Sequence, residues 1–328
     1  MMKKITVSAP GKLMLFGEHA VVYNRPCLVT AVDQRMRATI EILDSPDFFL
    51  DAPDVNITGY KKSMQELGKG EIPKGAKFVE IAVRNFAAEY KLAIGLKVTT
   101  KSEFSSQFGF GSSSASTVCV LNALAELTGK KLSDKQIFDL AYQTVLDIQG
   151  KGSGFDVAAA VFGGTLHFIT GGKVINPLHL NELPLIVGYS GIKADTVTLM
   201  NQVSEKAKKY PKVVNNIYTD IELLVGLAKK EMTQYNWQLV GELMNINQGF
   251  LESLGVSSGK LSAMIYAARD AGAYGAKLSG AGGGDCMIAL APDGKKKDVE
   301  KAIEAVGGEV IHVQTNAEGV RVESFDKV

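Results

Sequence analysis

The sequence predicts an α+β protein built from two domains. At 328 residues, the chain exceeds the size at which a single hydrophobic core usually keeps growing. Its second half contains an apolar β-type segment at 183–189, then several long stretches of helical periodicity and further short β-type segments. That order is typical of helices packed on one face of a small antiparallel sheet. We therefore expect a first domain at residues 1–181 and a second at 182–328.

The first half is predicted to alternate between strands and helices. Residues 4–9 alternate in polarity until Pro10 and Gly11, which predict the end of a strand. Residues 44–75 are polar and rich in Gly, Pro and Lys, so we expect an exposed excursion there. The other expected elements are strands within 28–42 and at 95–100, helices at 78–90, from 112 onward and at 133–147, and apolar structure at 157–170.

The second half is predicted to be mainly helical around a small sheet. Apolar residues recur there with the period of an amphipathic helix over several long stretches. The expected helices are 195–208, 213–233, 237–254, 262–271 and 298–306, and the expected strands are 183–189, 286–290, 309–313 and 320–323.

Composition and charge exclude several classes of function. The chain is 46% hydrophobic with a net charge of +1, which is ordinary for a globular protein and gives no excess charge for nucleic acid or a membrane surface. The apolar runs are too short to cross a bilayer, and the first residues lead into a strand, so we expect a cytoplasmic protein. Cys27, Cys119 and Cys286 lie far apart without a C-x-x-C pair, which predicts buried free thiols.

A segment rich in glycine and serine directly precedes a predicted helix. It consists of Gly109, Phe110, Gly111, Ser112, Ser113 and Ser114. Glycine lets the backbone approach a ligand, and the free N–H groups and dipole of a helix N-terminus favour an anion such as phosphate. Its G-x-G-x-x-S spacing fits neither the dinucleotide fingerprint nor the P-loop, and an ordinary loop with a serine cap stays open.

Further candidate residues accompany other glycine-containing segments. Lys12, Glu18 and His19 follow the first strand and supply a cation, an anion and a switchable donor, although solvated or packing roles are the alternatives. Asp156 follows a second glycine cluster and serves either as a helix cap or as the group that orients or deprotonates a hydroxyl. A third cluster at 279–284 predicts backbone that closes over a ligand, or a flexible loop.

Together these segments resemble the three ordered motifs of the GHMP small-molecule kinases, a family named after galactokinase and the homoserine, mevalonate and phosphomevalonate kinases. The resembling segments are 10–23, 109–115 and 277–286. Within the family, the string at 16–23 is most similar to archaeal mevalonate kinases. The resemblance implies an N-terminal domain of the ribosomal-protein-S5 type, a ferredoxin-like C-terminal domain, and ATP-dependent phosphorylation of the primary hydroxyl of mevalonate in the cleft between them.

The resemblance also implies roles for individual residues. Asp156 matches the catalytic aspartate and Lys12 the lysine that pairs with it, while Glu18, His19 and Thr196 match residues on the acceptor side. The implied cofactors are ATP and Mg²⁺, and the hydroxyl of Ser113 is expected to bind the Mg²⁺. The expected partner is a small-molecule substrate. A homodimer is also expected from the family. The implied ATP-binding residues are Gly109, Phe110, Gly111, Ser112, Ser113, Ser114, Gly280, Ala281 and Gly282.

Some positions depart from the family pattern. Ser105 and Gln107 stand where the phosphate loop usually has Pro and an extra Gly. Val145 stands where the family has a Mg²⁺-binding glutamate, and its side chain cannot bind a hard cation. Gln149 and Asp147 are the candidate substitutes.

Two alternative functions stay open. Residues 149–160 and 284–286 resemble phosphomevalonate kinases, and Lys151 beside Asp156 is a candidate for the extra cation that a phosphorylated acceptor needs. The carboxylate of Glu18 would repel a phosphorylated acceptor, so we favour mevalonate as the acceptor. The missing metal glutamate would also suit a non-catalytic ligand sensor of the same family, whereas a sensor has no need of Lys12 and Asp156 together.

Overall fold

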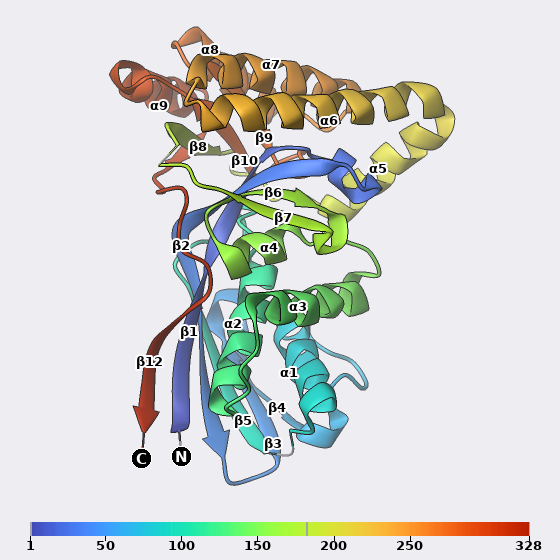
Figure 1. Cartoon of the computed structure of the whole chain (residues 1–328), viewed down its shortest axis with the longest axis vertical. Helices are drawn as coiled ribbons and strands as arrows, with labels where there is room; N and C mark the ends of the chain where they lie inside the picture. The colour runs from blue at the N-terminus through green and yellow to red at the C-terminus, as the bar shows by residue number, and fades with distance from the viewer. Residues whose placement is uncertain (1, 93, 182, 328) are drawn as a thin grey trace.

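The computed structural model describes residues 2–92, 94–181 and 183–327 (Figure 1). The described residues form two β-sheets, each covered by its own helices. The predicted domain boundary, which starts the second domain at residue 182, lies outside the described residues.

The larger sheet runs in the order β12-β1-β2-β5-β3-β4, with β6 and β7 joined to it through β2. Its strands pair antiparallel except for β3 and β5, which run parallel. Figure 1 shows it as the lower part of the molecule. Its strands are β1 (Met2–Phe16), β2 (Pro26–Leu43), β3 (Asp47–Ala52), β4 (Ile57–Ser63), β5 (Gly95–Ser102), β6 (Thr165–Ile169), β7 (Val174–Leu178) and β12 (Arg321–Lys327).

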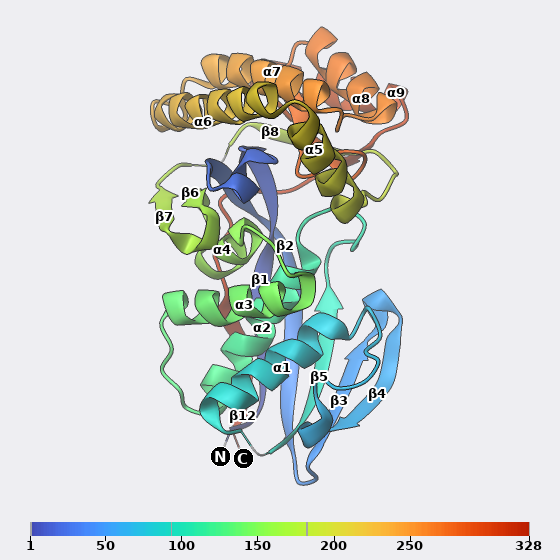
Figure 2. The same ribbon diagram turned by 90° about the vertical axis from the view of Figure 1, so that its right-hand side faces the viewer.

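Four helices cover one face of this sheet, and in Figure 2 they lie in front of β1, β2 and β5. They are α1 (Lys77–Tyr90), α2 (Ser112–Leu127), α3 (Asp134–Gln149) and α4 (Phe155–Phe162). Nearly all residues of α2 from Ser114 to Ala125 are buried, as expected for a helix enclosed by other elements. Val118, Leu121 and Leu124 are completely buried, so α2 forms the centre of this core.

The smaller sheet runs in the order β11-β8-β10-β9 and is entirely antiparallel. Its strands are β8 (Leu185–Tyr189), β9 (Gly275–Ser279), β10 (Cys286–Leu290) and β11 (Glu309–Ile311). The helices gathered at this end in Figure 1 are α5 (Thr196–Lys209), α6 (Pro211–Thr233), α7 (Trp237–Leu254), α8 (Gly259–Asp270) and α9 (Lys296–Ala305). This confirms the predicted α+β organisation of the second half.

Three local predictions were wrong. Strand β1 does not end at Pro10 but continues to Phe16, and a shift in its register with β2 after Pro10 accommodates the proline. The expected excursion at 44–75 contains the hairpin of β3 and β4, and in β3 buried residues alternate with half-buried ones. Strand β12 pairs with β1 in the larger sheet rather than with the smaller sheet.

Two further predictions concern the cysteines and the membrane. Cys27, Cys119 and Cys286 are free and buried, as predicted. Among the described residues, no helix combines the length and the apolar character that a membrane span requires.

Candidate active site

A cavity of about 330 Å³ lies where the two sheets meet. Strand β1, the N-terminal ends of α2 and α4, the start of α5 and the β9–β10 loop contribute to its wall. The predicted site residues that line it are Lys12, Glu18, His19, Gly109, Gly111, Ser112, Ser113, Lys151, Asp156, Thr196, Gly280 and Ala281. Phe110, Ser114 and Gly282, which were also predicted, do not line it.

The glycine- and serine-rich segment, residues 109–114, leads into the N-terminus of α2 at the cavity wall. Gly109 and Gly111 have φ angles of 75° and 80°, a left-handed conformation that glycine adopts without strain. Gly111 caps α2 without a side-chain hydrogen bond, so the first N–H groups of the helix are left for a ligand. Phe110 is 1% exposed and packs between Phe104 and Phe108, which anchors the segment. The arrangement has the geometry of a phosphate seat.

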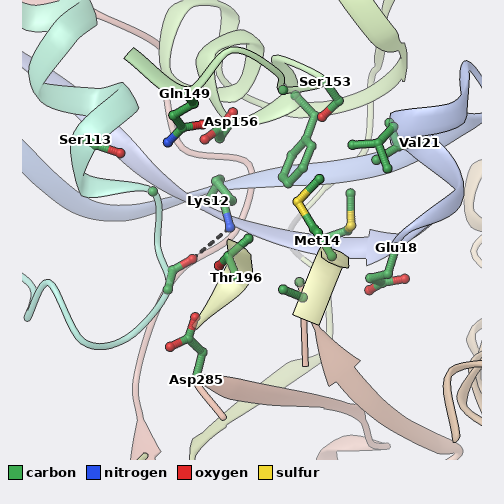
Figure 3. Close-up of a pocket in the computed structure, with 18 of the residues that line it drawn as sticks. Lys12, Met14, Glu18, Val21, Ser113, Gln149, Ser153, Asp156, Thr196 and Asp285 are labelled. Carbon is green, nitrogen blue, oxygen red and sulfur yellow. Dashed lines mark hydrogen bonds between the residues drawn. The ribbon is translucent and has the colours of Figure 1, made fainter. Parts of the chain in front are cut away.

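Lys12 lies at the centre of the cavity (Figure 3). Its Nζ donates a hydrogen bond to the carbonyl oxygen of Gly109 at 2.7 Å, which fixes the ammonium beside the anion seat. Burial lowers the pKa of Lys12, while the nearby carboxylates of Asp156 and Asp285 act in the opposite direction. The position of Lys12 therefore differs from the solvated strand end considered above.

Asp156 lies in the first turn of α4 and faces the same cavity. The N-cap of α4 is Gly154, so the alternative that Asp156 is the cap was wrong. Its Oδ2 accepts a hydrogen bond from the Ser114 hydroxyl at 2.7 Å, and its Oδ1 accepts one from the Val157 N–H at 3.1 Å. Two donors thus fix the direction of a carboxylate that faces the same cavity as Lys12, whose ammonium points toward the Gly109 carbonyl oxygen (Figure 3).

Glu18 and His19 form another part of the wall. Glu18 makes an ion pair with Lys277 of β9, and both side chains are fully buried. His19 adopts a φ of 59°, and its Nε2 lies 2.9 Å from the carbonyl oxygen of Ala281, so the ring donates there. Burial lowers the pKa of His19, which favours the neutral ring. The segment after β1 is therefore tied to the β9–β10 loop.

Thr196 and Lys151 lie at the rim. Thr196 is the first residue of α5, a helix capped by Asp195, whose carboxylate accepts the Thr198 N–H at 3.1 Å. Lys151 is exposed, and its Nζ donates to the Oδ1 of Asn201 at 3.3 Å. Both residues are exposed.

Lys193 and Asp285 also line the cavity and were missed as site residues. The Oδ1 of Asp285 accepts the Ala194 N–H at 2.9 Å and the Lys193 ammonium at 3.1 Å. Asp285 has a φ of 54°, a conformation that is uncommon outside glycine. The sequence signal that could have identified Asp285 is its position directly after a run of glycines.

The residues around the start of α2 fit a magnesium ion only in part. Val145 and Gln149 both line the cavity, but Asp147 faces away and accepts hydrogen bonds from Arg84 at 2.7 Å and Asn85 at 3.1 Å. Asp147 was therefore a wrong candidate. Within the part of the chain that the structure describes, no three His, Cys, Asp or Glu side chains gather as a metal site. Protein oxygens come instead from Ser113, Gln149 and Asp156.

Replacing Gly109 with alanine is expected to weaken ATP binding by about tenfold. A Cβ at this position would collide with the Asp285 carboxylate and would add about 1–2 kcal/mol of left-handed backbone strain. Titration with a fluorescent ATP analogue measures the effect. The matched control is Gly129→Ala beyond the other end of α2, where φ is 66° and no described atom lies within 4 Å of the added Cβ. Equal losses in both variants would contradict the assignment of the phosphate seat.

Comparisons with known proteins agree with this geometry. The family "GHMP kinases N terminal domain" matches residues 77–164, and "GHMP kinases C terminal" matches 228–310. The mevalonate kinase of Pyrococcus horikoshii is 36% identical, with 100% of both chains covered, and that of Methanothermobacter thermautotrophicus is 32% identical over 88% of this chain and 91% of the relative.

Solved structures show the same fold. The Methanococcus jannaschii mevalonate kinase matches with a TM-score of 0.81 and 26% identity, covering 94% of this chain and 97% of that one. The Lin0012 protein of Listeria innocua matches with a TM-score of 0.85 and 24% identity over 97% and 99% of the two chains, which shows the fold alone. With its two-sheet fold, its phosphate-seat geometry and relatives above 30% identity over its length, the chain belongs to the GHMP kinase family.

Proposed function

We propose that this protein is a mevalonate kinase, which transfers the γ-phosphoryl group of ATP to the primary hydroxyl of mevalonate. The observation that carries the proposal is the meeting of Lys12 and Asp156 in one cavity beside the N-terminus of α2. The full-length relatives named as mevalonate kinases support the choice of acceptor.

The proposed roles follow from charge and position. The free N–H groups at the start of α2 and the backbone of Gly280 and Ala281 hold the ATP phosphates, while Lys12 stabilises the charge on the transferred group. Asp156 orients the acceptor hydroxyl and accepts its proton. Phosphoryl transfer depends mainly on alignment and electrostatic stabilisation, which these groups supply.

Magnesium, when bound, would neutralise charge on the ATP phosphates. We propose that the Ser113 hydroxyl and the Gln149 amide oxygen help to hold it. Mg²⁺ keeps several waters and takes oxygen ligands, so two neutral protein oxygens together with the phosphates form a workable set. The homodimer and the cytoplasmic location stay predictions, as does the division into domains at residues 181 and 182.

Replacing Val145 with glutamate is expected to lower the Mg²⁺ concentration needed for nucleotide binding by roughly tenfold, because an added carboxylate increases affinity for a hard cation. Val145 is 5% exposed and lines the cavity one helical turn before Gln149. Titrating Mg²⁺ against binding of a fluorescent ATP analogue, without acceptor, measures this directly. Gln143→Glu adds the same charge on the exposed side of α3 and is the control. An unchanged Mg²⁺ requirement in Val145→Glu would contradict the placement of the ion beside α3.

The choice of acceptor is tested by ADP release with mevalonate, phosphomevalonate, homoserine and galactose in parallel. We expect turnover with mevalonate. Turnover with phosphomevalonate alone would refute the mevalonate proposal. Nucleotide binding without turnover of any of the four would indicate a ligand sensor.

A further inference from the structure

A completely buried ion pair joins the two sheets at the cavity wall. Glu18 follows the end of β1, whereas Lys277 lies in β9, 259 residues further along the chain. Both side chains have 0% exposure. The Lys277 Nζ contacts the Oε1 of Glu18 and also donates to the Leu278 carbonyl oxygen at 2.6 Å.

A contribution to folding stability does not by itself explain why this ion pair is present. Removing two charges from water is costly, and uncharged residues of similar volume often replace a buried ion pair without loss of stability. The two sheets are also joined here by Ser279, whose hydroxyl donates to the Met14 carbonyl oxygen at 2.9 Å and accepts the Met14 N–H at 3.0 Å. The junction between β1 and β9 therefore has a connection that does not depend on the ion pair.

The second oxygen of Glu18 indicates another role. Its Oε2 is buried and, among the described residues, has no hydrogen-bond partner in the protein. Buried carboxylate oxygens normally receive a hydrogen bond, and Glu18 lines the cavity. The neighbouring His19 donates its Nε2–H to the Ala281 carbonyl oxygen rather than to Glu18. A ligand hydroxyl would satisfy the oxygen.

We propose that Lys277 is a positioning residue, which fixes the Glu18 carboxylate through Oε1 so that Oε2 accepts a hydrogen bond from a hydroxyl group of the acceptor. The inference rests on the proposed function, because it assumes an alcohol as the second substrate. Burial lowers the pKa of Lys277, and the Glu18 carboxylate acts against that shift and favours the charged pair.

This pairing also changes the charge that a ligand meets. The negative charge of Glu18 would repel an anionic acceptor. The Lys277 ammonium directly contacts this carboxylate and largely offsets its charge. Glu18 then acts as a fixed hydrogen-bond acceptor rather than as an isolated negative charge. Such a group favours an acceptor whose hydroxyl can donate to Oε2 over an analogue that lacks this hydroxyl.

The test replaces the pair by neutral residues of similar shape in the double variant Glu18→Gln/Lys277→Met. We expect a folded protein with nearly unchanged ATP affinity and a KM for mevalonate raised about tenfold, because a hydrogen bond to a charged oxygen is replaced by a weaker one to the neutral amide oxygen of glutamine. The single variant Glu18→Gln should show the same loss. Circular dichroism and thermal unfolding check that each variant is folded.

The matched control is the double variant Lys62→Met/Glu80→Gln. This ion pair joins β4 to α1 at 2.8 Å, with Glu80 fully buried, and neither residue lines the cavity. Its removal should leave the KM for mevalonate unchanged. A wild-type KM in the folded Glu18→Gln/Lys277→Met variant would overturn the inference and leave the pair a structural connection.

Two remaining outcomes are also decisive. If the double variant does not fold, Glu18→Gln alone decides, and a wild-type KM for mevalonate in that variant overturns the inference. If the wild-type protein does not phosphorylate mevalonate at all, the proposed function fails first and this inference fails with it.

Discussion

Asparagine in place of Asp156 is expected to lower kcat by about 10²–10⁴-fold, the usual contribution of a positioned general base. Asparagine can still accept the hydrogen bond from Ser114, so the start of α4 should keep its geometry. Other residues form the proposed phosphate seat, and ATP affinity should therefore stay within a few-fold of the wild-type value. Single-turnover kinetics with a parallel ATP titration separates the two effects.

The control for this variant is Asp134→Asn. Asp134 is also an aspartate in the first turn of a helix, but it is exposed at the start of α3. Its replacement should leave kcat unchanged. Normal turnover by Asp156→Asn would remove Asp156 from the mechanism.

Methionine in place of Lys12 is expected to reduce kcat/KM by about 10²–10³-fold, because a preorganised donor to the transferred group is lost. The ammonium is buried and held by the Gly109 carbonyl oxygen, so no exposed lysine can substitute for it without rearrangement. Steady-state kinetics with ATP and mevalonate as the varied substrates measures the loss.

The pH profile gives a second signature of Lys12. Burial lowers its pKa below the usual 10.5 of a lysine, so in the free enzyme the ammonium loses its proton at a lower pH than an exposed lysine would. We therefore expect kcat/KM to fall on the alkaline side below pH 10.5. Lys12→Arg keeps its charge at high pH, and any residual activity should lack this alkaline fall.

Lys4→Met is the matched control for Lys12→Met. Lys4 lies on the same strand, β1, but is partly exposed and pairs with Glu41 at 3.4 Å. Its loss should change kcat/KM little, since exposed ion pairs contribute little to stability. Equal effects of the two substitutions would show that Lys12 acts only through the fold.

Local patterns were sufficient to predict most helices and the glycine-rich start of α2. The apolar period of α2 and the glycines before it are determined by neighbouring residues, so the sequence contains both signals. The same holds for α3, whose predicted start at Ser133 is a capping box with Gln136.

Contacts between distant segments could not be predicted in this way. The pairing of β12 with β1 and the ion pair of Glu18 with Lys277 each join residues far apart in the chain, and neither has a local pattern. The β3–β4 hairpin was missed because its strands carry charged residues on the exposed face. The resemblance to a family supplied site roles, but it did not indicate which side chains hold one another in place.

The most direct test of the proposed function is product analysis by phosphorus and carbon NMR after incubation with Mg²⁺, ATP and mevalonate. The proposal predicts ADP and 5-phosphomevalonate in equal amounts, with the new phosphate ester on the primary hydroxyl. It also predicts that Asp156→Asn forms neither at a comparable rate. An intact mevalonate spectrum, with turnover only when phosphomevalonate is supplied, would contradict the assignment of mevalonate as the acceptor.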